Sequence, residues 1–83
     1  MEQVARTQKQ LGAALRRQRK HLGLTQSALA AKISSRQATV SDLEGGDRDT
    51  HLQTVFELLA ALDLELVVRP RTQRDAAQLE AIF

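Results

Sequence analysis

The 83-residue sequence contains no cysteine, which excludes disulfide bonds, thiolate metal sites and cysteine nucleophiles together. Its two histidines, His21 and His51, lie thirty positions apart and offer no metal-ligand spacing. The longest apolar run, residues 58–62, has five residues, whereas a membrane-spanning helix needs roughly 20. The N-terminus also lacks the apolar stretch of a signal peptide. We therefore expect a soluble, cytoplasmic chain that has no cofactor and is not an enzyme.

Charge is distributed unevenly along the chain, although the net charge is only +2. Residues 1–41 carry eight lysines and arginines against one acid, Glu2, whereas residues 42–83 carry four against nine acids. A basic half joined to an acidic half predicts one surface for polyanions and a different surface for another purpose. On charge alone, the alternative that many of these groups form solvated helix faces stays open. We interpret one run as such a face, with at most one or two phosphate contacts: Arg16, Arg17, Arg19 and Lys20.

Four short helices are expected between residues 7 and 62, because capping residues precede four segments with helical apolar spacing. The expected caps are Thr7, Thr25, Ser35 and Thr50, the last in a capping box with Gln53. The helices run from these caps to about residues 22, 32, 44 and 62, and glycines at 23 and 45–46 follow the first and third. The residues expected on core faces are Leu11, Ala14, Leu15 and Leu22 of the first helix and Leu52, Val55, Phe56, Leu59 and Leu62 of the fourth.

An alternating pattern replaces the helical one after residue 63, where Leu64, Leu66 and Val68 are separated by single residues and followed by a proline. This pattern predicts a half-buried strand, and a lone strand leaves its backbone groups unpaired. Pairing with the same strand of a second copy across a two-fold axis solves the problem and predicts a C2 dimer. The alternative is that residues 62–68 extend the fourth helix, although Val-Val before Arg-Pro favours extended structure.

Residues 26–43 fit two short helices packed across a turn. Such packing needs inward apolar residues at the fourth, eighth, fifteenth and eighteenth positions and a small residue at the fifth. Counted from Gln26, these positions hold Leu29, Ile33, Val40, Leu43 and, at the fifth, Ala30. With Thr-Gln-Ser-Ala-Leu-Ala at 25–30 and Ala-Thr-Val-Ser-Asp-Leu-Glu at 38–44, residues 11–62 closely resemble the Xre/Cro/phage-repressor helix-turn-helix superfamily. The resemblance implies a lambda-repressor-like domain of four to five helices.

The same resemblance implies which residues contact DNA. Gln37 matches the glutamine that begins base reading in the major groove. The residues expected to read bases are Arg36, Gln37, Ala38 and Ser41, and those expected to contact phosphates are Gln26, Ser27 and Thr39. The alternative for each of them is an ordinary solvent-exposed side chain.

Three further positions bear on the geometry of the motif. Arg19 and Glu44 match a family ion pair that ties the first helix to the third, and we interpret both as structural. The family's usual turn glycine is replaced by Ser34, which costs about 1 kcal/mol relative to glycine if its φ is positive.

The segment after the fourth helix narrows the resemblance. Leu-Asp-Leu-Glu-Leu-Val-Val-Arg at 62–69 looks like the dimerising strand of HipB-type antitoxins, and Ser-Arg-Gln-Ala-Thr-Val-Ser at 35–41 resembles their recognition helix. This implies a dimeric, nucleoid-associated repressor of its own operon that binds an inverted repeat in double-stranded DNA. It also implies an antitoxin that binds a HipA-type serine/threonine kinase toxin. Two alternatives are a stand-alone Xre-type repressor or restriction-modification controller, and a helix-turn-helix used only for protein interaction.

The expected organisation has three parts: a helix-turn-helix domain over residues 1–62, a dimerisation strand over 63–70 and a tail over 71–83. The fold class is therefore all-α with one C-terminal strand. In the tail, Ala76, Leu79 and Phe83 share one helical face, but about a dozen residues form only a marginal helix. The tail is either a segment that docks on a partner through Leu79, Ile82 and Phe83 or a frayed end without a role.

Overall fold

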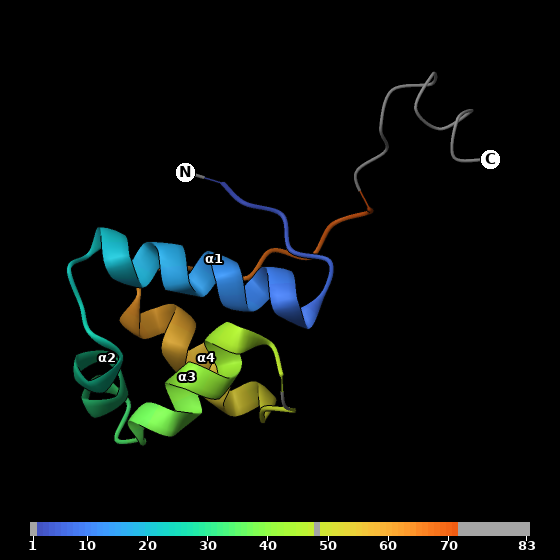
Figure 1. Cartoon of the computed structure of the whole chain (residues 1–83). Coiled ribbons are helices and arrows are strands. Elements are labelled where there is room, and N and C mark those ends of the chain that lie inside the picture. The colour runs from blue at the N-terminus through green and yellow to red at the C-terminus, as the bar shows by residue number, and fades with distance from the viewer. Residues whose placement is uncertain (1, 48, 72–83) are drawn as a thin grey trace.

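The computed structural model describes residues 2–47 and 49–71, and within them it contains four helices and no strand. The helices are α1 (Gln8–His21), α2 (Gln26–Lys32), α3 (Gln37–Gly45) and α4 (Leu52–Ala61). In Figure 1, α3 runs beneath α1 and in front of α4, with α2 at one end of the bundle. Because α3 packs against both α1 and α2, one of its faces is buried and the other points outward.

The first two helices begin where the sequence predicts. The Thr7 hydroxyl accepts a 3.0 Å hydrogen bond from the backbone N–H of Gln10, and the Thr25 hydroxyl accepts one of 3.0 Å from that of Ala28. Each bond satisfies an amide that has no partner inside its helix, which contributes about 1 kcal/mol. Both predicted caps are confirmed.

The caps predicted for the other two helices are wrong by one position each. Arg36, not Ser35, occupies the N-cap of α3, and His51, not Thr50, occupies that of α4; neither side chain makes a capping hydrogen bond. The capping box of Thr50 and Gln53 is therefore not formed. A cap contributes about 1 kcal/mol, whereas burying one leucine contributes about 1.5–3 kcal/mol, so core packing decides where these helices begin.

The core lies where the helix-turn-helix spacing predicts. Ile33 is partly buried against this core, and the other four inward positions of the motif are fully within it. The buried apolar residues are Leu15, Leu29, Ala30, Val40, Leu43, Val55, Leu58, Leu59 and Leu62.

The predicted core faces of α1 and α4 need correction. Leu22 caps the end of α1 and is exposed, and on α4 the side chains of Leu52 and Phe56 are 66% and 47% exposed. The buried stripe of α4 includes Leu58, which the sequence-based prediction left out. Leu52 and Phe56 are four residues apart, so they form a second, exposed apolar stripe on α4.

Three helices end in the same hydrogen-bonding arrangement, a Schellman motif. At the end of α4 the N–H of Leu64 donates to Leu59 O at 2.8 Å and the N–H of Asp63 donates to Ala60 O at 3.1 Å. Asp63 has φ 60°, in the left-handed region. α4 therefore stops at Ala61, and the alternative in which it extends to residue 68 is wrong.

The segment after this stop forms neither helix nor strand, so the predicted strand is absent from the described part of the single chain (Figure 1). Leu64 packs against the core, but Leu66, Val67 and Val68 are exposed, the last of them 91%. A strand is stabilised by hydrogen bonds to a neighbouring strand, and one copy of this chain provides no such neighbour.

The tail residues Leu79, Ile82 and Phe83 lie outside the described residues, so the expectation for them stays a prediction. None of the described helices has the length and apolar character needed to cross a membrane.

Ser34 is the left-handed residue of the Schellman motif that ends α2, with φ 54°. A side chain with a Cβ is strained in this region, whereas glycine is not. We expect Ser34→Gly to raise the free energy of unfolding by up to about 1 kcal/mol, or the thermal midpoint by about 4 °C, despite the greater flexibility of the unfolded chain. Thermal denaturation followed by circular dichroism measures this. Ser35→Gly is the matched control and is expected to bring no gain; equal midpoints for both variants would contradict the prediction.

Candidate nucleic-acid interface

A buried ion pair joins α1 to α3. Arg19 Nε lies 2.6 Å from Glu44 Oε2 and Arg19 Nη2 lies 3.0 Å from Glu44 Oε1, a bidentate arrangement. The side chains are only 9% and 4% exposed, so both charges are largely removed from water. Arg19 Nη1 also donates to Leu24 O at 2.8 Å, which ties the pair to the turn before α2.

The ion pair keeps its charge because the hydrogen bond and the attraction from Glu44 raise the pKa of Arg19 above its ordinary value, while burial acts in the opposite sense. The guanidinium therefore stays protonated at any pH at which the protein folds.

A chain of hydrogen bonds connects this pair to the molecular surface. Gln26 Nε2, at the start of α2, donates to Glu44 Oε1 at 3.2 Å, and Gln37 Nε2, at the start of α3, donates to Gln26 Oε1 at 2.7 Å. A carboxylate only accepts hydrogen bonds, so Glu44 requires the amide nitrogen of Gln26 to face it. The amide oxygen of Gln26 then faces Gln37. We call these four side chains the glutamine relay: Arg19, Glu44, Gln26 and Gln37.

The glutamine relay determines which hydrogen-bonding groups of Gln37 remain available to a ligand. One of its N–H groups is used on Gln26, which leaves its carbonyl oxygen and a second N–H for a ligand. A neighbouring donor and acceptor on one amide match the N7 and N6 groups on the major-groove edge of adenine. Because Gln37 is exposed, a ligand can reach these atoms.

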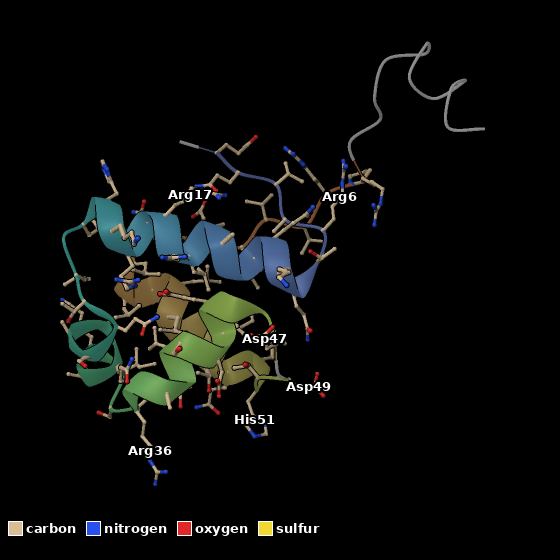
Figure 2. The ribbon with its side chains drawn as sticks, in the orientation of Figure 1. Arg6, Arg17, Arg36, Asp47, Asp49 and His51 are labelled. Carbon is tan, nitrogen blue, oxygen red and sulfur yellow. The ribbon has the colours of Figure 1, made fainter. Side chains whose placement is uncertain are left out.

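The outward face of α3 carries the residues that the sequence predicts to read bases. They are all exposed, and α3 turns its opposite face, with Val40 and Leu43, to the core. In Figure 2, Arg36 projects away from the rest of the protein beside the start of α3. The exposed members of this set are Arg36, Gln37, Ala38 and Ser41.

The residues predicted to contact phosphates differ in how exposed they are. Ser27 is exposed in the first turn of α2, Thr39 is half-buried, and Gln26 is half-buried within the relay. The structure thus brings Gln26 and Gln37 together and leaves Ser27 on the neighbouring surface. Within residues 2–47 and 49–71, no group of three His, Cys, Asp or Glu side chains is placed to hold a metal ion.

Sequence reasoning missed that Glu44 orients the two glutamines. The sequence-based interpretation assigned Glu44 only to the ion pair with Arg19. In the structure, that ion pair uses both carboxylate oxygens of Glu44. The signal was the pair of glutamines, eleven positions apart, at the first positions of α2 and α3. Gln26, at the start of α2, reaches Glu44 because α3 packs against α1 and α2, and Gln37 is linked to Glu44 only through Gln26.

Known proteins share this architecture. The model of the helix-turn-helix family HTH_3 matches residues 15–68. Antitoxin HipB from Escherichia coli O6:H1 is 41% identical over 59 residues, which are 71% of this chain and 63% of that protein. The chain thus spans slightly less than two thirds of this relative.

Solved structures agree with these matches. The HipB chains of a HipB–O4 20mer complex and of a HipA–HipB–O2–O3 complex each align with a TM-score of 0.78 and 35% identity, over 86% of this chain and 100% of theirs. Fold, motif spacing and sequence therefore lead to one conclusion: this chain belongs to the Xre-like helix-turn-helix family and is similar to the HipB antitoxins.

Proposed function

We propose that this chain is a sequence-specific, dimeric DNA-binding repressor that is also the antitoxin of a HipA-type serine/threonine kinase and represses its own operon. The observation that carries the proposal is the exposed amide of Gln37, which the glutamine relay holds at the start of α3 with a donor and an acceptor available. Similarity to HipB, which is solved in complex with 20mers and with HipA, supports the same function.

The recognition step in this proposal is insertion of α3 into the major groove. A helix with its side chains is about 10–12 Å wide, and the major groove is about 12 Å wide. Gln37 then reads an adenine edge, Arg36 reaches a guanine or a phosphate, and Ala38 leaves room for a thymine methyl group. Ser41, one turn further along α3, continues the same exposed face.

Dimerisation is the second element of the proposal. Residues 63–70 form the dimerisation segment, in which Leu64, Leu66 and Val68 pair with the same residues of a second copy. Support comes from the exposed apolar side chains that follow the end of α4 and from the alternating sequence pattern of this segment. Residues 1–62 then form the DNA-binding domain and residues 71–83 a tail.

The antitoxin role is the third element, and it rests on similarity to HipB. It is tested by purifying the chain from its native host: a kinase retained in stoichiometric amount supports the role. Recovery of the chain without a kinase contradicts it and favours a stand-alone repressor.

Selection of duplexes from a random pool tests the DNA-binding proposal. The parent chain is expected to select inverted repeats whose half-sites lie about 34 Å apart, because two α3 helices enter successive major grooves. Gln37→Ala is expected to lose preference at one base step of each half-site, at about 1–3 kcal/mol per step. Competition binding with single-base variants of the selected site measures this loss.

Ser27→Ala is the matched control, since Ser27 is an exposed polar residue of the neighbouring helix and is proposed to touch only phosphate. It is expected to weaken binding to all sequences equally. If Gln37→Ala retained the full preference of the parent, its base-reading role would be wrong. If the parent selected no sequence, the repressor proposal itself would fail, and selection of single half-sites would contradict the dimer.

A further inference from the structure

Three basic residues lie along one face of α1. Lys9, Arg16 and Lys20 are separated by seven and four positions, and Ala13 lies between the first two, so all share one side of the helix. At 1.5 Å per residue they cover about 16 Å of the helix axis. We call this set the α1 ridge.

The ridge has no evident role in holding the fold together. All three side chains are exposed, and within the described part of the chain none of them has a hydrogen bond or an ion pair. No acidic residue occurs between residues 3 and 41 to neutralise them. Like charges four positions apart on a helix repel each other by a few tenths of a kcal/mol, so the ridge slightly destabilises α1.

The remaining arginines of the same helix behave differently. Arg19 is buried with Glu44, and Arg17 Nε donates to Gln3 Oε1 in the N-terminal segment at 3.0 Å. Figure 2 shows Arg17 above α1, near the N-terminal segment. Of the four basic residues between positions 16 and 20, Arg16 and Lys20 are therefore the two whose side chains form no hydrogen bond or ion pair within the described residues, and they share the helix face of Lys9.

The ridge adjoins the outward face of α3. A hollow between the two helices is lined by the three ridge residues, by Ala13 and Arg17 of α1, and by Glu44 and Gly45 at the end of α3. Gly45 lies one turn after Ser41, so the exposed surface continues from Gln37 along α3 to the ridge. The charge of Glu44 is compensated by Arg19, and the end of α3 carries only about half a negative charge against three full positive charges.

We propose that the α1 ridge binds the phosphate backbone of the same DNA duplex whose major groove receives α3. This inference rests on the proposed DNA-binding function and adds a binding surface to it. Phosphates of one strand follow one another at about 3.4 Å along the helix axis, so a ridge of about 16 Å passes several of them and three cations neutralise up to three. Ammonium and guanidinium groups on long side chains bind phosphates without reading bases, so the ridge strengthens binding to every sequence.

The test compares the parent with the triple variant Lys9→Gln, Arg16→Gln, Lys20→Gln in binding to a fluorescent duplex of random sequence, between about 50 and 200 mM salt. Each phosphate contact contributes about 0.9 to the slope of log affinity against log salt, so the slope is expected to become shallower by about 2–3. At low salt, the affinity is expected to fall on the order of tenfold to a hundredfold, equally for random and selected duplexes. Because the substituted side chains are exposed and unpaired, the thermal midpoint is expected to stay the same or rise slightly.

Lys32→Gln is the control, because it removes one positive charge, as each of the three ridge substitutions does. Lys32 lies in the last turn of α2, away from α1, and lines a separate hollow with Ile33 and with Glu57, Ala60 and Ala61 of α4. It is expected to leave the salt slope unchanged. A triple variant with the parent's slope would overturn the proposal for the ridge while leaving the repressor proposal intact. A triple variant whose loss of affinity per removed charge equals that of Lys32→Gln would do the same. A parent that shows no salt-dependent binding to any duplex would overturn both.

Discussion

Glu44→Ala is expected to lower the free energy of unfolding by about 3–5 kcal/mol, because it leaves the Arg19 guanidinium buried without its counter-ion. Only the 2.8 Å bond to Leu24 O would then compensate its lost hydration. At roughly 0.05–0.15 kcal/mol per residue, a domain of this size is stable by about 4–12 kcal/mol, so the loss is a large fraction of the total. Urea denaturation followed by circular dichroism measures it.

The double variant Arg19→Met, Glu44→Leu removes both charges but keeps most of the side-chain volume. It therefore distinguishes the contribution of the ion pair to stability from that of packing. Apolar residues of similar volume often replace a buried ion pair with little loss, so this variant is expected to recover most of the parent's stability. It also removes the acceptor that orients Gln26, so we expect a folded protein with reduced base preference at the Gln37 step. A double variant as unstable as Glu44→Ala would contradict the first expectation, and one with full preference would contradict the relay.

Much of the fold could be predicted from the sequence because its determinants are local. Thr7 and Thr25 satisfy amides three residues away, and the inward positions of the helix-turn-helix follow a fixed spacing. The start of α4 could not be predicted in this way, since packing of Val55 and Leu58 outweighs the capping preference of Thr50.

The region after α4 shows a different limit of prediction from the sequence. Asp63 adopts a left-handed conformation that usually marks glycine, so the end of the helix at about residue 62 was indicated only by the change of pattern, and a longer helix stayed open as an alternative. The alternating residues that follow do favour a strand, but a strand is completed only by hydrogen bonds from another strand. A pattern within one chain cannot form it, and within the described residues of the single chain the segment forms no strand.

For the site, the sequence indicated which residues belong together but not the direction of their hydrogen bonds. The polarity of the glutamine relay follows from the carboxylate of Glu44, which reaches Gln26 only because α1, α2 and α3 meet there. The interpretation of residues 16–20 as one solvated face was wrong for Arg19, which is buried. Each residue rotates about 100° around a helix, so neighbours in sequence reach different surroundings.

Gly12→Ala is expected to destabilise the protein by about 1–3 kcal/mol, although alanine normally favours a helix over glycine by about 1 kcal/mol. A Cβ at position 12 would lie 2.3 Å from Leu43 O and 2.5 Å from Glu44 O, far inside contact distance. Both oxygens belong to the backbone of α3 and cannot rotate away, so α1 and α3 would have to separate. That separation would also stretch the Arg19–Glu44 ion pair, which joins the same two helices. Chemical denaturation measures the loss.

Gly45→Ala is the matched control, because Gly45 is also a helical glycine whose added Cβ would meet an atom at less than 3 Å. Here the atom is Asp47 Oδ2, at 2.7 Å, on an exposed side chain that can move aside. The gain in helix propensity should then dominate, and stability should stay equal or rise by up to about 1 kcal/mol. Opposite signs for the two alanines would show that close approach of α1 to the backbone of α3 requires glycine at position 12. A stabilising Gly12→Ala would mean that the two helices pack less tightly than described.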